Sequence, residues 1–487
     1  MANPYMQVPQ SGNGGPWWRI EWVLAKRIVS LGLPVVVGMV TQTAINTVDL
    51  VMIGRLPEEV AVPGTAAILA AVVVLWAFGG FLSAISVGTQ AVSARRFSEG
   101  KLKQVGAALT NSLLVAAAAS LLITGLALWL APRLLQWMVP SPEVLRLANS
   151  YGFIRLLGLP SMALTASYKS FYDGIGQVRV HMTVAVGMSL LNAVLDYILI
   201  FGGCLGGICV EPMHVDGAAW GSLFSSYAGL LCMVLWSLRS QDRSRFAVYR
   251  WRNARLSVGG TIARLSLWSG LASLILMTGV VVFISIVAHL DVLEQARDIN
   301  SAACSIIVHI MMIVFVGCLA FGTATAVLVS QSIGAGLPAL AERYGKQSAL
   351  LAMYVMGMLG ALAALFPQTV LHLFLPADFA VAGDELKEMV IARAVPSLRL
   401  AALIMTPLSA GAMVLTQALY GAGKTRYVMV VELVLHFGCL VPLAWLFAIP
   451  LRLGLLGCWI AATLYAAGLF GATAWAFARG KWKTVAL

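Results

Sequence analysis

The chain has 487 residues, of which 60% are hydrophobic and only 11% are charged. Soluble domains carry about 25% charged residues and cannot bury so much apolar surface, and disordered segments show the opposite balance. Seven cysteines in a chain of this length exclude a disulfide-rich secreted scaffold. The composition therefore predicts a polytopic helical membrane protein. The meaning of the net charge of +12 depends on where the charges lie.

Apolar segments of the length that crosses a membrane, about 20 residues, recur twelve times along the chain. The predicted helices lie at 28–53, 66–92, 105–130, 148–170, 179–202, 217–238, 264–289, 302–330, 347–373, 394–420, 427–449 and 455–478. The first 27 residues are polar and rich in Pro and Gly, and no cleavable signal peptide is evident in them.

The charges follow the alternation of these segments. Most Lys and Arg residues fall on one side of the membrane, and most Asp and Glu residues on the other. Basic loops face the cytoplasm, so a multi-pass inner-membrane protein with both termini cytoplasmic is expected. The basic stretch 239–263 is then a cytoplasmic connector beside anionic lipid, and no nucleic-acid partner is expected.

The two sets of six segments resemble each other. SVGTQAVSARRFSEG (86–100) matches GTATAVLVSQSIGAG (322–336), and DGIGQVRVHM (173–182) matches YGAGKTRYVM (420–429). Six is an even number, so both halves share one orientation, and a pseudo-twofold axis along the membrane normal relates them. We expect an N-terminal segment 1–27, an N-lobe 28–238, the connector 239–263, a C-lobe 264–478 and a tail 479–487. Two such lobes suit alternating access, although duplication without transport is the plainer alternative.

Three motifs carry a resemblance to a known family. The chain reads LGLPVVVGMVTQTAINTVDLVMIGRL at 31–56, LLNAVLDYILIFG at 190–202 and ARGKW at 478–482. These resemble the multidrug and toxic compound extrusion (MATE) transporters over nearly the whole chain. The resemblance implies a secondary active efflux transporter that exchanges a cationic or amphipathic drug or metabolite for H⁺ or Na⁺. It implies no enzyme activity, no cofactor and a monomer among membrane lipids. The alternative within the superfamily is a flippase for lipid-linked oligosaccharides.

Ionisable residues at membrane depth are costly and are candidates for function by default. Asp49 lies in the first segment, and Asn192 and Asp196 lie one turn apart on one face of the fifth. By themselves, Asp49 is also compatible with a helix cap, and the other two with a buried hydrogen-bonded pair. The resemblance implies that these three residues, with Ser222, bind the coupling cation, and that the first helix bends at Pro34. This set of oxygens suits Na⁺ or a shared proton.

The second half lacks acids that part of the family carries. Segments 264–289 and 394–420 contain no carboxylate, which makes the chain DinF-like rather than NorM-like and places the expected coupling site in the first half. Glu432 and His436, one turn apart, are either a second protonatable pair or a packed ion pair. His309 alone is more typical of a hydrogen-bonded core histidine. The candidates for the substrate cavity are Gln42, Asn46, His309, Glu432 and His436.

Other features of the sequence narrow the alternatives. No Walker A motif, protease or esterase signature, or metal-ligand spacing occurs, so an intramembrane enzyme is disfavoured and no metal other than Na⁺ is expected. A channel would not need two matching lobes. Cys204 and Cys209 flank a turn and are either free thiols or a disulfide. Arg155 is interpreted as a residue that extends to the membrane interface, with contact to an anionic group in the cavity as the alternative.

Overall fold

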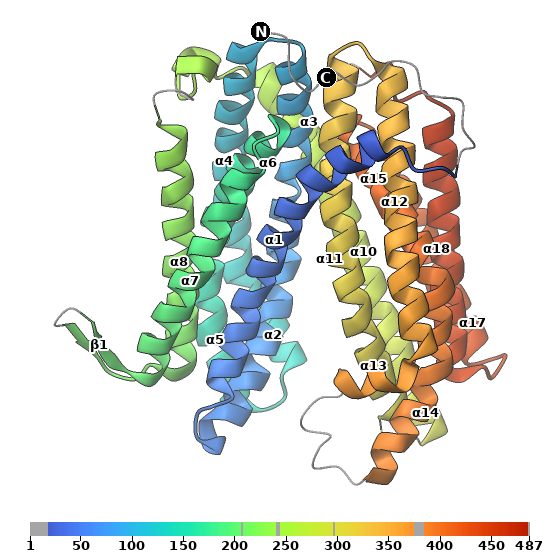
Figure 1. Cartoon of the computed structure of the whole chain (residues 1–487). Helices are drawn as coiled ribbons and strands as arrows, with labels where there is room; N and C mark the ends of the chain where they lie inside the picture. The colour runs from blue at the N-terminus through green and yellow to red at the C-terminus, as the bar shows by residue number, and fades with distance from the viewer. Residues whose placement is uncertain (1–17, 206–207, 240–243, 296–297, 375–383, 486–487) are drawn as a thin grey trace. The chain divides into compact units, whose positions relative to one another are not determined.

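The computed structural model describes residues 18–205, 208–239, 244–295, 298–374 and 384–485. Almost all of these residues are helical (Figure 1). Among them, residues 34–270 form one compact unit, and residues 18–33 and 271–485 form the other. The two units therefore correspond to the two halves of the sequence, except that the start of the first helix of each half belongs to the other unit.

The first half contains the helices α1 (Trp22–Ile53), α2 (Glu58–Ser83), α3 (Ile85–Ser98), α4 (Leu102–Met138), α5 (Pro142–Leu156), α6 (Leu159–Gly174), α7 (Arg179–Phe201) and α8 (His214–Ser237). Between α7 and α8 the strands β1 (Gly203–Leu205) and β2 (Ile208–Val210) pair as an antiparallel hairpin. The register makes Cys204 and Cys209 Cα partners, while their side chains lie outside the described part of the structure.

The second half follows a short 3-10 turn, η2 (Trp251–Asn253). It contains α10 (Leu256–Glu294), α11 (Ile299–Gly334), α12 (Pro338–Leu365), α13 (Pro367–Leu373), α14 (Asp384–Leu400), η4 (Ala401–Met405), α15 (Thr406–Gly421), α16 (Thr425–Leu435), η5 (His436–Leu440), α17 (Val441–Ala448) and α18 (Gly454–Ala478). The segments η4 and η5 are single π-helical turns inside longer helices.

Eleven helical segments in the described ranges are long and apolar enough to cross a membrane. The predicted fourth span is absent from this set because the chain breaks between α5 and α6, which have only 15 and 16 residues. Pro160 lies in the first turn of α6, where its missing N–H and its ring favour a helix start over a helix interior. The two short helices together cover the predicted fourth span. The prediction of an all-α polytopic membrane protein is confirmed.

The helices of the two halves pack in the same pattern. In the first half α2 contacts α5, α3 contacts α6, and α7 contacts α8; in the second, α11 contacts both α14 and α15, and α17 contacts α18. In each half, the helix at the sixth predicted segment approaches the helix at the fifth through a glycine: α8 approaches α7, and α18 approaches α17. A Cβ on Gly217 would lie 2.5 Å from the Leu199 carbonyl oxygen, and one on Gly457 would lie 2.7 Å from the Phe447 carbonyl carbon. The repeat seen in the sequence is thus also a repeat of helix packing.

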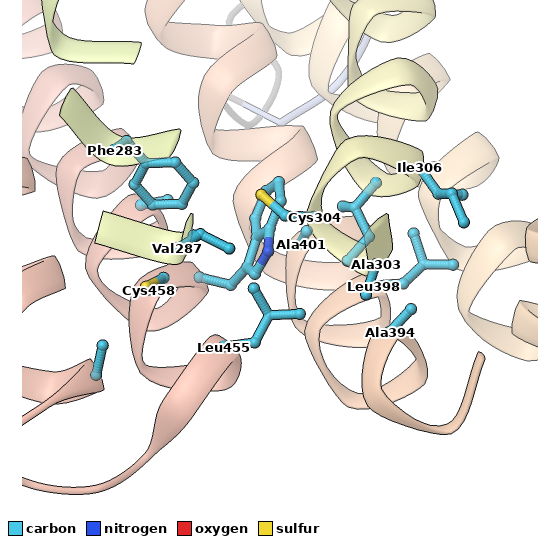
Figure 2. Close-up of a cluster of buried hydrophobic side chains, with 14 of the residues drawn as sticks. Phe283, Val287, Ala303, Cys304, Ile306, Ala394, Leu398, Ala401, Leu455 and Cys458 are labelled. Atoms are coloured by element: carbon cyan, nitrogen blue, oxygen red, sulfur yellow. The ribbon is translucent and has the colours of Figure 1, made fainter. Parts of the chain in front are cut away.

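Each half has its own buried core. In the second half, side chains from α10, α11, α14 and α18 interlock, including Phe283, Cys304, Leu398 and Leu455 (Figure 2). Between membrane helices such contacts stabilise through close packing, because lipid is as apolar as the buried side chains. Many further apolar side chains are exposed on the helices, among them Trp137, which is 86% exposed. Exposed apolar faces of this extent fit helices that face lipid.

The first helix of each half begins in one unit and ends in the other. The units divide α1 between Leu33 and Pro34, and α10 between Gly270 and Leu271. The start of α10 packs in the first-half core, to which Ile262 belongs. The predicted lobe boundaries, 28–238 and 264–478, stay a prediction about membrane segments.

Candidate functional site

A buried polar cluster surrounds Asp49, which lies in the last turns of α1. Asp49 is 0% exposed, so its carboxylate depends on protein groups for hydrogen bonds. Its Oδ2 accepts a hydrogen bond from Ser222 Oγ on α8 at 3.0 Å and a longer one from the Tyr151 hydroxyl on α5 at 3.3 Å. Three helices of the first half therefore meet at this one oxygen.

The fifth helix of the first half, α7, supplies the second carboxylate. Asn192 and Asp196, both 0% exposed, are one turn apart and share a face of this helix. Asn192 Nδ2 donates to Ser222 Oγ at 3.3 Å, and Asp196 interacts electrostatically with Asp49. Asp49, Asn192, Asp196 and Ser222, which the sequence analysis grouped, thus lie together.

A glycine makes room for the second carboxylate. A Cβ on Gly221 would lie 2.1 Å from Asp196 Oδ1 and 3.1 Å from its backbone nitrogen. No side chain fits in that space, since real Cβ atoms do not approach other heavy atoms so closely. The packing of α8 against α7 therefore explains two residues of the GAAWGS sequence at 217–222. Gly221 lets α8 approach α7 at Asp196, and Ser222 supplies the hydroxyl donor to Asp49.

One member of the site was missed from sequence. Tyr151 was not singled out, because a tyrosine in an apolar segment is usually a packing residue. Arg155, one turn further along α5, was predicted to reach the membrane interface or, as the second alternative, to contact an anionic group. Its guanidinium carbon lies 6.0 Å from the Tyr151 ring centroid, and its charge acts on Asp196. The one-turn spacing of Tyr151 and Arg155 was the available signal.

The chemistry of this cluster follows from its composition. Two buried carboxylates beside each other are unfavourable when both are charged, so such a pair shares a proton or holds a cation. The neighbouring amide and hydroxyl groups are the oxygen and donor groups that hard cations and protons use. Within the described ranges, no group of three or more His, Cys, Asp or Glu side chains forms a transition-metal site.

The other predicted residues lie elsewhere. Pro34 is inside α1, which is a continuous helix on both sides of it. Gln42 and Asn46 have backbone atoms in α1, but their side chains lie outside the described part of the structure. His309 on α11 is exposed, and its Nδ1 lies 2.7 Å from the Ser305 carbonyl oxygen. None of these four residues has a described side-chain contact with the Asp49 cluster.

Glu432 and His436 lie in the second half, in a separate cluster with Tyr465. His436 Nδ1 lies 3.3 Å from Glu432 Oε2, and the Tyr465 hydroxyl donates to the same oxygen at 2.9 Å. Glu432 is 9% exposed and His436 is 0% exposed. The pair was predicted to be either protonatable or packed, and it is buried and in contact.

Comparisons with known proteins agree with this architecture. The MatE family profile matches residues 34–198 and 269–446. The multidrug resistance protein PmpM of Pseudomonas aeruginosa is 26% identical over 64% of this chain and 63% of its own length, so that match spans less than two thirds of PmpM. A probable multidrug resistance protein NorM of Rhizobium meliloti is 24% identical over 92% of each chain.

Solved structures give the same fold. A multidrug resistance MATE family transporter in an outward-facing conformation aligns with a TM-score of 0.82 at 21% identity, over 96% of this chain and 98% of that one. A MOP superfamily transporter from Pyrococcus furiosus aligns with a TM-score of 0.80 at 22% identity, over 97% and 98% of the two chains.

These matches define a polytopic membrane transporter rather than an enzyme. The chain belongs to the MatE family. The resemblance drawn from its motifs is therefore confirmed, whereas the DinF-like assignment of its acidic residues stays a prediction.

Proposed function

We propose that the chain is a secondary active exporter that removes cationic or amphipathic drugs or metabolites by alternating access, driven by H⁺ or Na⁺. The observation that carries this proposal is the pair of buried carboxylates, Asp49 and Asp196, in a family of transporters. The relatives PmpM and NorM are named as multidrug resistance proteins, which supports this substrate class. The proposed setting is an inner membrane with both termini cytoplasmic, and a monomeric chain with no nucleic-acid partner.

The hydrogen bonds suggest different roles for the two carboxylates. Two hydroxyl groups, from Ser222 and Tyr151, donate to Asp49 Oδ2. Such donors stabilise a charged carboxylate. We therefore assign Asp49 as the carboxylate that stays charged, and the coupling ion lowers the charge of the pair from −2 to −1, either as a proton on Asp196 or as Na⁺ among the oxygens.

Coupling requires that the ion bind one conformation better than the other. Asp49 is well placed for this because it lies on α1, the helix that begins in one unit and ends in the other. We propose that ion binding changes the bend of α1 at Pro34, which lies at the division between the units. The change would open the substrate cavity outward and release the substrate.

The test is efflux from proteoliposomes under separately imposed H⁺ and Na⁺ gradients. Asp49→Asn keeps the size of the side chain but removes its charge, and it should insert normally and lose gradient-driven efflux. Glu99→Gln is the control, because Glu99 forms its ion pairs with Arg96 and Lys101 just after α3, away from the cluster. Full efflux by Asp49→Asn under both gradients would overturn the proposed coupling site, and the gradient that drives the native chain identifies the ion.

A further inference from the structure

The Glu432–His436–Tyr465 cluster has the features of a second proton site. Two polar contacts between side chains join its members, and the rings of His436 and Tyr465 lie 4.5 Å apart, centroid to centroid. His436 Nδ1 also lies 2.9 Å from the Glu432 main-chain oxygen. Both neighbours of Nδ1 are acceptors, so Nδ1 carries a hydrogen. The other ring nitrogen, Nε2, is buried and has no hydrogen-bond partner among the described residues.

The local backbone is irregular at this position. His436 begins η5, a π-helical turn between α16 and α17. Single π-helical turns inside α-helices are rare and often mark functional sites, because the inserted residue redirects neighbouring side chains. The π-turn is an observation independent of the side-chain contacts, and it falls on the titratable residue of the cluster.

The neighbouring helix α10 lies directly against the imidazole. A Cβ on Gly279 would lie 2.2 Å from His436 Cδ2 and 3.2 Å from Nε2. The glycine therefore leaves space beside the unpartnered nitrogen. Since α10 begins in one unit and ends in the other, any displacement of α10 changes the surroundings of this nitrogen.

We propose that Glu432, His436 and Tyr465 form a proton-binding site in the second half of the chain, with occupancy linked to the position of α10. An incoming proton from water bonds to His436 Nε2, while Nδ1 keeps its hydrogen toward Glu432. The imidazole becomes an imidazolium, and the net charge of the cluster changes from −1 to zero. Two coupled groups of this kind take up the proton as a unit.

The charged and titratable groups around the cluster are few. Tyr420 on α15 and Cys439 in η5 act electrostatically on its members, and both are neutral in ordinary conditions. Near Gly279, α10 carries no titratable side chain. Among the described residues, no Lys or Arg is one of the groups that act on Glu432 or His436, so the imidazole becomes the cationic partner of the carboxylate once it is protonated. A buried net charge is costly in such surroundings, which favours the protonated cluster until water reaches it.

The site is tested by titration, which requires no transport. The full chain, with its six histidines labelled with ¹⁵N, is reconstituted in liposomes and followed by solid-state NMR between about pH 5 and pH 8, the range in which histidine usually titrates. His436→Gln identifies the relevant signal, and His309→Gln is the matched control that removes a different one. We expect the His436 ring to pass from one protonated nitrogen to two within this range.

Two further variants distinguish a proton site from a packing contact. Glu432→Gln removes the anionic partner and should lower the proton affinity of His436 about tenfold or more. Tyr465→Phe keeps the ring but removes the donor to the carboxylate, and should move the midpoint in the opposite direction, to higher pH. A His436 ring that stays in one state throughout, or midpoints that neither variant moves, would overturn the proposal. Its link to export rests on the proposed function, but the titration stands even if Asp49→Asn proves fully active.

Discussion

Asn111 on α4 and Gln347 on α12 form equivalent bridges. Each side-chain amide makes two hydrogen bonds to the backbone just ahead of the first helix of one half. Asn111 Nδ2 donates to the Asn253 carbonyl oxygen at 2.7 Å, and its Oδ1 accepts from the Arg255 N–H at 2.9 Å. These two backbone groups immediately precede α10. The same sequence interval separates Asn111 from Gln347 as separates Gly100 from Gly336 in the repeated motif.

The bridge made by Gln347 has the same geometry. Its Nε2 donates to the Arg19 carbonyl oxygen at 3.0 Å, and its Oε1 accepts from the Glu21 N–H at 2.9 Å, just ahead of α1. A planar amide that pairs with one carbonyl and one N–H two residues apart satisfies both backbone groups at a helix start, where intrahelical partners are missing. The helix α4, at the third predicted segment of the first half, thus anchors the start of α10. In the same way α12, at the third predicted segment of the second half, anchors the start of α1.

The first prediction concerns these anchors. Asn111→Leu and Gln347→Met keep approximate side-chain size but remove both hydrogen bonds, each worth about 1 kcal/mol. The Arg255 amide in the first variant and the Glu21 amide in the second should exchange with deuterium roughly 5- to 30-fold faster. Each variant serves as the control for the other, because its effect should be confined to its own segment. Unchanged exchange at both amides would show that the bridges do not hold these segments.

The second prediction concerns orientation. The distribution of charge predicts that Lys103 lies on the cytoplasmic side and Lys387 on the outer side. A membrane-impermeant amine reagent added to intact cells should therefore modify Lys387 and spare Lys103, and inverted vesicles should reverse the pattern. Peptide mass spectrometry reads both sites in one sample. Modification of Lys103 in intact cells would place the termini outside.

Much of the fold was predictable because membrane helices appear in the sequence as long apolar segments. The apolar segments, their number and their repetition required only hydropathy and short motifs. The division of α1 and α10 between the two units was not predicted. The break between α5 and α6 was not predicted, because a long apolar segment with one proline is also compatible with a kinked single helix. The π-helical turns at Ala401–Met405 and His436–Leu440 have no recognised pattern in the residues themselves.

In the candidate site, the two carboxylates could be predicted from their chemistry, and Asn192 and Ser222 from the family resemblance. Asp49 and Asp196 were conspicuous because acids are rare at membrane depth. Tyr151 and Gly221 contribute a hydroxyl and an empty space, and both residue types are common in apolar helices, so their role depends on which helices meet. That information is tertiary, and hydropathy does not contain it.

The third prediction tests the empty space at Gly221. Gly221→Ala places a methyl group where the Asp196 carboxylate now lies, and overpacking of this kind costs about 1–3 kcal/mol. If that cost falls on the occupied site, ion affinity drops about 5- to 150-fold. Gly229→Ala on the same helix is the matched control, since its methyl group would meet the flexible Met188 side chain at 2.8 Å. Ion-dependent efflux measured at several ion concentrations should need much more ion in the first variant only. Equal ion dependence in both variants would contradict the assigned position of Asp196.

The fourth prediction separates the two hydroxyl donors to Asp49. Tyr151→Phe and Ser222→Ala each remove one donor from Oδ2, and a hydrogen bond to a charged group contributes about 1.5–3 kcal/mol. The Tyr151 bond is longer, 3.3 Å against 3.0 Å, so its loss should weaken ion dependence less than the loss of the Ser222 hydroxyl. Both donors reach the same oxygen, so the double variant should lose more or less than the sum of the single losses, because contacting residues in one network are coupled. Ion-dependent efflux by the four members of the cycle measures that coupling. Strict additivity would mean that Tyr151 and Ser222 act on separate sites, and the shared role of Asp49 Oδ2 would then be wrong.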